Sequence, residues 1–194
     1  CPFHLTPNQR RQVFSSLDEI QAAFEKAVAS LNRLVVICSV VEQLELNRLI
    51  PHLQGPDSIQ IGFSQIGQIN LERQTLPAHL IIVESEIRKI KANDARCKEQ
   101  VRIRNSNIGI ANFGSATIEG RSLFQGNSIT LARFTSARFL DTVSFNQDIP
   151  EGIHPDELSE YQGEDPTEFE ETALFYGADF EGMADFTGVE FEKG

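Results

Sequence analysis

The sequence of 194 residues contains no Trp, only two Tyr and one Met, yet it contains fourteen Phe. Its three cysteines, Cys1, Cys38 and Cys97, are widely spaced and odd in number, so neither a disulfide framework nor a zinc knuckle is indicated. The longest stretch dominated by apolar residues, Leu34 to Val41, has eight residues, which is too short to span a bilayer. No transmembrane segment is therefore expected, and the preference for Phe over Trp and Tyr needs an explanation.

Motifs of enzymes are also absent. The four histidines are scattered, and no pair has the spacing of metal ligands. There is no phosphate-binding loop, no dinucleotide fingerprint and no nucleophile elbow. Cys38 lies in a stretch rich in Val and Ile, and we expect it to be a small buried hydrophobe. The sequence predicts a protein that is not an enzyme and needs neither cofactor nor metal.

The chain also has no excess of positive charge. The net charge is −11, and residues 1–100 carry eleven acids and eleven Lys or Arg. Residues 101–194 carry seventeen acids and six Lys or Arg. Because phosphate binding needs clustered Lys and Arg, direct binding of nucleic acid is not expected. The acidic half favours partners with a basic surface, or serves solubility alone.

Residues 1–34 predict one amphipathic helix. Thr6 suits the N-cap, Pro7 the first helical position and Gln9 the capping box. Large and small apolar residues then recur with the spacing of one helix face. They are Val13, Leu17, Ile20, Phe24, Ala27, Leu31 and Leu34. We expect this helix either to cap the rest of the chain by packing on it or to form a coiled-coil seam with a second copy.

A repeat with a step of five residues runs through the second half of the chain. It has single-residue slips before Ile129 and Phe145, and nine of the fourteen Phe fall on it. The residue two positions earlier is usually small, while Arg121 and Asn127 break this rule. The repeat comprises Ile108, Phe113, Ile118, Leu123, Ile129, Phe134, Phe139, Phe145, Phe169, Phe175, Phe180, Phe186 and Phe191.

A step of five fits neither an α-helix nor a flat strand, whose side-chain periods are 3.6 and 2.0. It fits a chain that turns a corner every five residues, with one large and one small side chain inside each segment. Successive coils would stack roughly 4.8 Å apart, so that Phe packs on Phe. Trp or Tyr would bring a polar atom to an axis without a partner for it, which explains the bias toward Phe.

Units such as Ala111-Asn112-Phe113 and Ala178-Asp179-Phe180 resemble the pentapeptide repeat family, whose signature is a small residue, then Asn or Asp, then Leu or Phe. The resemblance covers residues 106–145 and 167–191. It implies a mainly β fold, a right-handed parallel β-helix with four sides and about twenty residues per coil. It also implies three inner columns: Phe113, Phe134 and Phe175; Ile118, Phe139 and Phe180; and Leu123, Phe145 and Phe186.

The expected organisation is the helix 1–34 followed by the β-helix over 35–194. Its coils are expected to be irregular over 35–105 and regular over 106–146 and 167–194. A separate small fold upstream is the alternative. The missing initiator Met and the final unit Val189-Glu190-Phe191, which has no cap after it, also suit one domain of a larger protein.

An acidic segment, residues 147–166, interrupts the repeat. Ten acids and no Lys or Arg lie between Asp148 and Glu171, and we expect the coils themselves to be close to neutral. Such a long interruption is usually functional or disordered. The residues that we expect to contact a partner are Asp148, Glu151, Asp156, Glu157, Glu160, Glu164, Asp165 and Glu168.

These features predict a protein-interaction module or scaffold that acts through its outer faces and the acidic segment. Its partner would be a protein with a basic surface. The alternative, which the resemblance implies, is a mimic of DNA that binds a type II topoisomerase such as gyrase and inhibits it or protects it from quinolones. We expect a bacterial, cytoplasmic protein, with a homodimer through the N-terminal helix or the C-terminal coil as one alternative.

Overall fold

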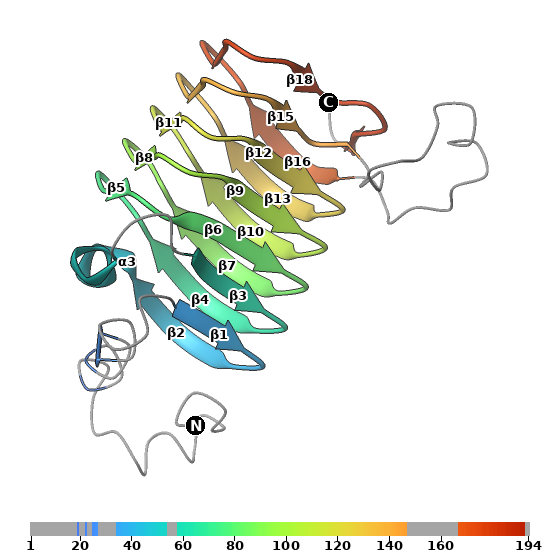
Figure 1. The fold of residues 1–194 in the computed structure, drawn as a ribbon. Helices are drawn as coiled ribbons and strands as arrows, with labels where there is room; N and C mark the ends of the chain where they lie inside the picture. The colour runs from blue at the N-terminus through green and yellow to red at the C-terminus, as the bar shows by residue number, and fades with distance from the viewer. Residues whose placement is uncertain are drawn as a thin grey trace, which may run out of the picture.

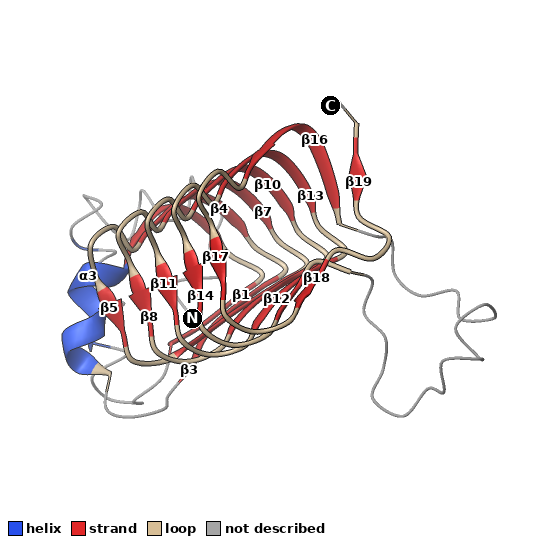
Figure 2. Cartoon of the chain, turned by 90° about the horizontal axis from the view of Figure 1, so that it is seen from above, coloured by secondary structure: helices blue, strands red, loops and turns tan. Residues whose placement is uncertain are grey.

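The computed structural model describes Glu19, Ala22, Glu25 and Lys26 and residues 34–53, 58–146 and 167–192. Over these residues the chain winds into a β-solenoid whose strands pair in parallel with those of the neighbouring coils (Figure 1). Seen from above, the coils enclose one continuous interior (Figure 2). The expected mainly β fold of stacked parallel strands is confirmed.

Three sheets run along the solenoid, with seven, seven and five strands. Sheet A consists of β1 (Leu34–Ile37), β3 (Ser58–Gly62), β6 (His79–Val83), β9 (Val101–Arg104), β12 (Ser122–Gln125), β15 (Val143–Ser144) and β18 (Ala184–Asp185). Sheet B consists of β2 (Val40–Glu45), β4 (Gln65–Asn70), β7 (Glu86–Lys91), β10 (Asn107–Asn112), β13 (Ser128–Arg133), β16 (Glu168–Leu174) and β19 (Glu190–Phe191). Sheet C consists of β5 (Thr75–Leu76), β8 (Arg96–Cys97), β11 (Thr117–Ile118), β14 (Arg138–Phe139) and β17 (Asp179–Phe180).

The regular coils between residues 58 and 146 contain 21 residues each rather than the twenty that the resemblance implies. Hydrogen bonds between equivalent residues of neighbouring coils join positions 21 apart along the chain. Hydrogen bonding also divides the coil into three sheets instead of four. The strands β2, β4, β7, β10 and β13 of sheet B nevertheless have two inward positions each, because two consecutive outer residues such as Gly109 and Ile110 separate the inward Ile108 and Ala111. Four inward-facing segments per coil are therefore retained.

The extra residue lies in the same place in successive coils. Between sheet C and sheet A, the large inward residues are separated by six positions instead of five. Ile118 is followed by Phe124, and Phe139 by Phe145. A longer segment on one side of the coil therefore explains the slips in the five-residue repeat.

This longer segment corrects one member of the third expected column. Phe124, and not Leu123, stacks on Phe145, with the ring centroids 5.0 Å apart. Leu123 lies on the outer side of the strand, although only 3% of it is exposed. The small residue two positions before the inward side chain is then Ser122 instead of Arg121, so the rule that Arg121 seemed to break is kept.

Stacked aromatic rings fill the interior toward the C-terminal end. Phe134 stacks between Phe113 and Phe175, with centroid distances of 5.5 Å and 5.0 Å. Phe139 stacks on Phe180 at 5.2 Å, above Ile118, with which it pairs. These two columns have the members that the repeat predicts. The third continues from Phe145 to Phe186 at 4.9 Å.

The coils over residues 58–105 are as regular as those over 106–146, whereas the first coil is longer and pairs with the next 25 residues apart. From Ser58 onward the strands of sheet A pair 21 residues apart, so the expectation of irregular coils over 35–105 is wrong for 58–105. Buried Ile, Leu and Val take the places that Phe takes later. Residues 54–57 lie outside the described residues.

A column of buried polar residues joins the coils at the corner between sheets A and B. The Ser64 N–H donates to Ser85 Oγ at 3.2 Å, and the Ser85 N–H donates to Ser106 Oγ at 3.1 Å. Each hydroxyl donates in turn to the carbonyl two residues earlier. Because these groups satisfy one another, burial leaves none of them unpaired. The column comprises Ser39, Ser64, Ser85, Ser106, Asn127 and Thr167.

The same corner places one cysteine in solvent. Cys38 occupies a left-handed conformation with φ of 51° and is exposed, which corrects the expectation that it is buried. Its flanking residues alternate between the interior and solvent, as in any strand, so the apolar neighbours do not enclose it. Cys97 in sheet C is fully buried, and burial raises the pKa of its thiol to about 12.

Few residues of the expected N-terminal helix are described. Glu19, Ala22, Glu25 and Lys26 are helical, and the remainder of residues 1–33 lies outside the described residues. Glu25 Oε1 lies 2.6 Å from Nε of Arg48, which belongs to the short helix α3 (Leu46–Leu49). A 3-10 turn, η2 (Ile50–His52), follows α3. Leu34 belongs to β1 and pairs with Ile59, so the helix does not extend to residue 34.

Candidate interaction surfaces

Buried side chains fill the interior of the solenoid. Phe113, Phe134 and Phe139 are completely buried, as are the small residues Ala116 and Ala137 beside them. Among the described residues, no group of three or more His, Cys, Asp or Glu is arranged to hold a metal ion.

The acidic segment leaves and rejoins the solenoid at fixed points. Phe145, just before it, is completely buried in the interior. Thr167, just after it, is also completely buried, and its Oγ1 donates to the carbonyl of Phe124 at 2.7 Å. The Asn127 N–H donates to Thr167 Oγ1 at 3.3 Å, so the column of polar residues continues across the interruption.

Seven of the eight acids that we expect to contact a partner lie outside the described residues, and Glu168 alone is described. Glu168 begins β16, where it pairs with Ser128 and with Glu190. The pKa of its carboxyl is raised above the ordinary value of 4.5, chiefly by a hydrogen bond to Glu192, and further by desolvation and neighbouring carboxylates. The last strands of sheet B therefore hold negative charges close together.

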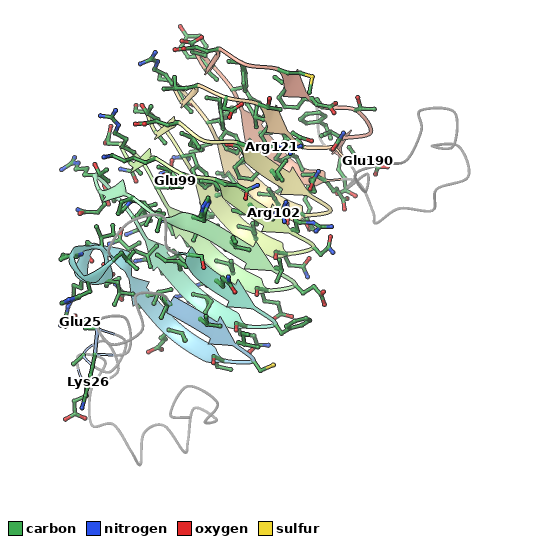
Figure 3. The ribbon with its side chains drawn as sticks, viewed as in Figure 1. Glu25, Lys26, Glu99, Arg102, Arg121 and Glu190 are labelled. Carbon is green, nitrogen blue, oxygen red and sulfur yellow. The ribbon has the colours of Figure 1, made fainter. Side chains whose placement is uncertain are left out.

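The last described coil is acidic on every side. Residues 167–192 carry eight acids and no Lys or Arg. Within this coil Glu170 accepts hydrogen bonds from the hydroxyls of Ser128 and Thr130 in the previous strand, the latter at 2.7 Å. In Figure 3, Glu190 lies at the opposite end of the solenoid from Glu25 and Lys26.

The middle coils carry the opposite charge. Residues 86–138 contain ten Lys or Arg and four acids, a net charge of +6. The expectation that the coils are close to neutral is therefore wrong for the individual coils, because their charges are segregated along the solenoid. Arg102 in β9 and Arg121 just before β12 are among the positive residues, labelled in Figure 3. The balanced charge of residues 1–100 conceals this positive region in the sequence, because the halves of the chain do not coincide with its coils.

Ion pairs between neighbouring coils neutralise part of this charge on sheet C. Arg96 pairs with Glu119 in the next coil. Arg138 pairs with Glu181 at 2.5 Å and approaches Asp179 at 3.7 Å. All of these side chains are partly or largely exposed, so each pair contributes little to stability. They bring positive and negative side chains of neighbouring coils together at sheet C.

Comparison with known proteins adds no relative. No family model matches the chain, and no match was found among the curated proteins or the solved structures. None of the described helices is long and apolar enough to cross a membrane. The fold and its surfaces define the class of the protein, a parallel β-solenoid repeat protein with opposite charges in its middle and last coils.

Proposed function

We propose that this chain is a non-enzymatic scaffold that binds a protein with a basic surface. The acidic segment 147–166 and the acidic last coil provide the binding surface, and the solenoid holds them in place. The observation that supports this most directly is the position of the segment, which is flanked by the buried residues Phe145 and Thr167. A rigid support reduces the ordering cost that a partner must overcome on binding.

We also propose that the chain is a divergent pentapeptide repeat protein. In its support, small residues lie two positions before stacked rings, as in Ala111 and Phe113 or Ala132 and Phe134. The coil of 21 residues departs from the family's twenty. Self-association through the N-terminal helix or the C-terminal coil is part of the same proposal, since Met183 and Phe191 in the last coil are 66% and 53% exposed.

Mimicry of DNA is the second candidate, and the eight acids of the last coil favour it. A mimic needs negative charge spaced along its length, like the phosphates of the duplex. The middle coils, with a net charge of +6 over residues 86–138, interrupt such a pattern. The scaffold is therefore the better supported of the two.

A gyrase supercoiling reaction separates these candidates. We would titrate the chain into the reaction alongside a copy that lacks residues 148–166. The scaffold predicts no inhibition and no protection from quinolones when the chain is well in excess of gyrase. Inhibition or protection that disappears with the segment, and that weakens steeply with salt, would instead support mimicry of DNA.

A further inference from the structure

The outer face of sheet B carries positive side chains that form no ion pair within the described part of the chain. Arg88, Lys89 and Lys91 project from β7, and Arg133 projects from β13. The strand between them, β10, has no charged residue. Strands β7, β10 and β13 lie side by side (Figure 1). One sheet face therefore presents four cations close to one another, together with the exposed Glu86 at the start of β7, which accepts a hydrogen bond from Gln65.

These cations differ from those on sheet C. Among the residues that the structure describes, no ion pair and no side-chain hydrogen bond involves Arg88, Lys89, Lys91 or Arg133, whereas Arg96 and Arg138 are paired. Arg88 and Arg133 are exposed, and Lys89 and Lys91 are half-buried. An anionic partner could therefore bind these cations without displacing the side chain of a described acid.

The shape of the face suits an extended chain. Lys91, Asn112 and Arg133 are in register, so the two cations lie about 10 Å apart, two coil spacings. Beside Arg88 the neighbouring coil has Gly109, where a Cβ would lie 2.7 Å from the Arg88 carbonyl oxygen. No side chain can therefore rise beside Arg88 at this position. The half-buried Ile110 and Leu131 continue the row of Lys89 and add apolar surface.

We propose that the sheet B basic face, formed by Arg88, Lys89, Lys91, Arg133, Ile110 and Leu131, binds an acidic polypeptide segment that also carries apolar residues. The four positive side chains of this face would form ion pairs with the carboxylates of the segment, and the Ile110 and Leu131 side chains would contact its apolar residues. None of the six residues is aromatic, so the face lacks the stacking platform that single-stranded nucleic acid uses. This surface goes beyond the proposed function, which uses charge of the opposite sign.

Fluorescence anisotropy on the full chain tests this directly. The probe is a fluorescein-labelled synthetic peptide of alternating Glu and Leu. The control peptide has the same length and label, with Gln in place of Glu. The test variant is Lys89→Glu with Lys91→Glu. The control, Lys98→Glu with Arg121→Glu, changes the net charge equally on other faces of the solenoid. Circular dichroism establishes that both variants fold.

We expect saturable binding of the Glu peptide that weakens at least about tenfold in the sheet B variant and about twofold or less in the control, because the lost contacts are local. Equal weakening in both variants, or equal binding of the Gln peptide, would overturn the proposal. Tighter binding of a single-stranded oligonucleotide at this face would assign it to nucleic acid instead. Self-association of the chain alone that the sheet B variant abolishes would assign the face to a second copy and not to a separate acidic partner.

Discussion

At the scale of single residues, Phe134 lies where several rings meet. Phe113 and Phe175 stack on its two sides, and Phe124 and Phe145 approach it edge-on at 5.6 Å and 5.5 Å. Such contacts add to the free energy of burying the ring itself. The Phe134 side chain is therefore expected to contribute more to the stability of the solenoid than a buried side chain without such ring contacts.

Replacing Phe134 with Ala is expected to lower the free energy of unfolding by about 3–5 kcal/mol, because it removes a buried ring and leaves a cavity. Urea denaturation measures the change. The control is Tyr176→Ala, since Tyr176 is 84% exposed and such surface changes stay within about 0.5 kcal/mol. Equal effects of the two substitutions would contradict the inward position of Phe134.

The two described cysteines are expected to differ in reactivity. In a chain with Cys1 replaced by Ser, we expect a thiol reagent at pH 8 to modify one thiol in the native protein and two after denaturation. Cys38 is exposed, whereas Cys97 is buried and the pKa of its thiol is raised to about 12, so it forms almost no thiolate. Two fast-reacting thiols in the native chain would contradict this. The variant Cys38→Ser identifies the reactive residue.

The pair Leu123 and Phe124 shows how far single residues could be predicted. Hydrophobicity alone cannot choose between two adjacent large apolar residues, so the repeat assigned Leu123 to the interior one position too early. The small residue two positions before the inward side chain was the better guide, because Ser122 is buried and Arg121 is exposed. The preference for Phe, in contrast, follows directly from a core without polar partners.

At the scale of elements, the column of polar residues between sheets A and B ties the coils together. Ser85→Ala removes the hydroxyl that accepts the buried Ser64 N–H. We expect a loss of about 1–3 kcal/mol in the free energy of unfolding, because a buried donor is left unpaired. Ser58→Ala is the control, since among the described residues its Oγ accepts a hydrogen bond only from the exposed Gln60 side chain. Urea titration of both variants measures the difference, and a neutral Ser85→Ala would contradict the account.

The regularity of the early coils was harder to predict from the sequence. Their inward positions hold Ile, Leu and Val, which occur in any buried strand, so the five-residue repeat is hard to see there. The recurrence of Ser at positions 64, 85 and 106 carried the period of 21, but three serines at that distance form no recognised motif. Only the hydrogen bonds between coils made the period plain.

At the scale of the whole molecule, the acidic segment is an insertion in an otherwise continuous solenoid. Asn127 and Thr167 are equivalent positions of successive coils and lie 40 residues apart. Removing the nineteen residues 148–166 reduces this separation to 21, the spacing between successive members of the column from Ser64 to Asn127. The coil can therefore close without the segment.

We expect the chain without 148–166 to melt at the same temperature as the full chain or slightly above it, because the entropy cost of closing a long loop is removed. Differential scanning calorimetry of both chains measures this. As a control, removing four residues from a coil, 107–110, should abolish cooperative melting, since it breaks the register of sheet B. A large drop in melting temperature on removal of 148–166 would show that the segment is part of the fold.

The charge along the solenoid could not be predicted before the length of the coil was known. Counting by halves of the chain gave a balanced first half and an acidic second half. Once the coils are defined, the basic residues 86–138 separate from the acidic residues 167–192. The acidic segment was recognised from its composition, whereas the sheet B basic face requires knowing which strands are neighbours.

The central claim is that the acidic segment recruits a basic protein. Its most direct test is quantitative affinity capture from nuclease-treated lysate of the cells that encode this chain. The full chain is compared with one in which Gly and Ser replace residues 148–166 at equal length. We predict at least one basic protein that the full chain enriches and the replaced chain does not. Capture of the same proteins in the same amounts by both chains would contradict the claim.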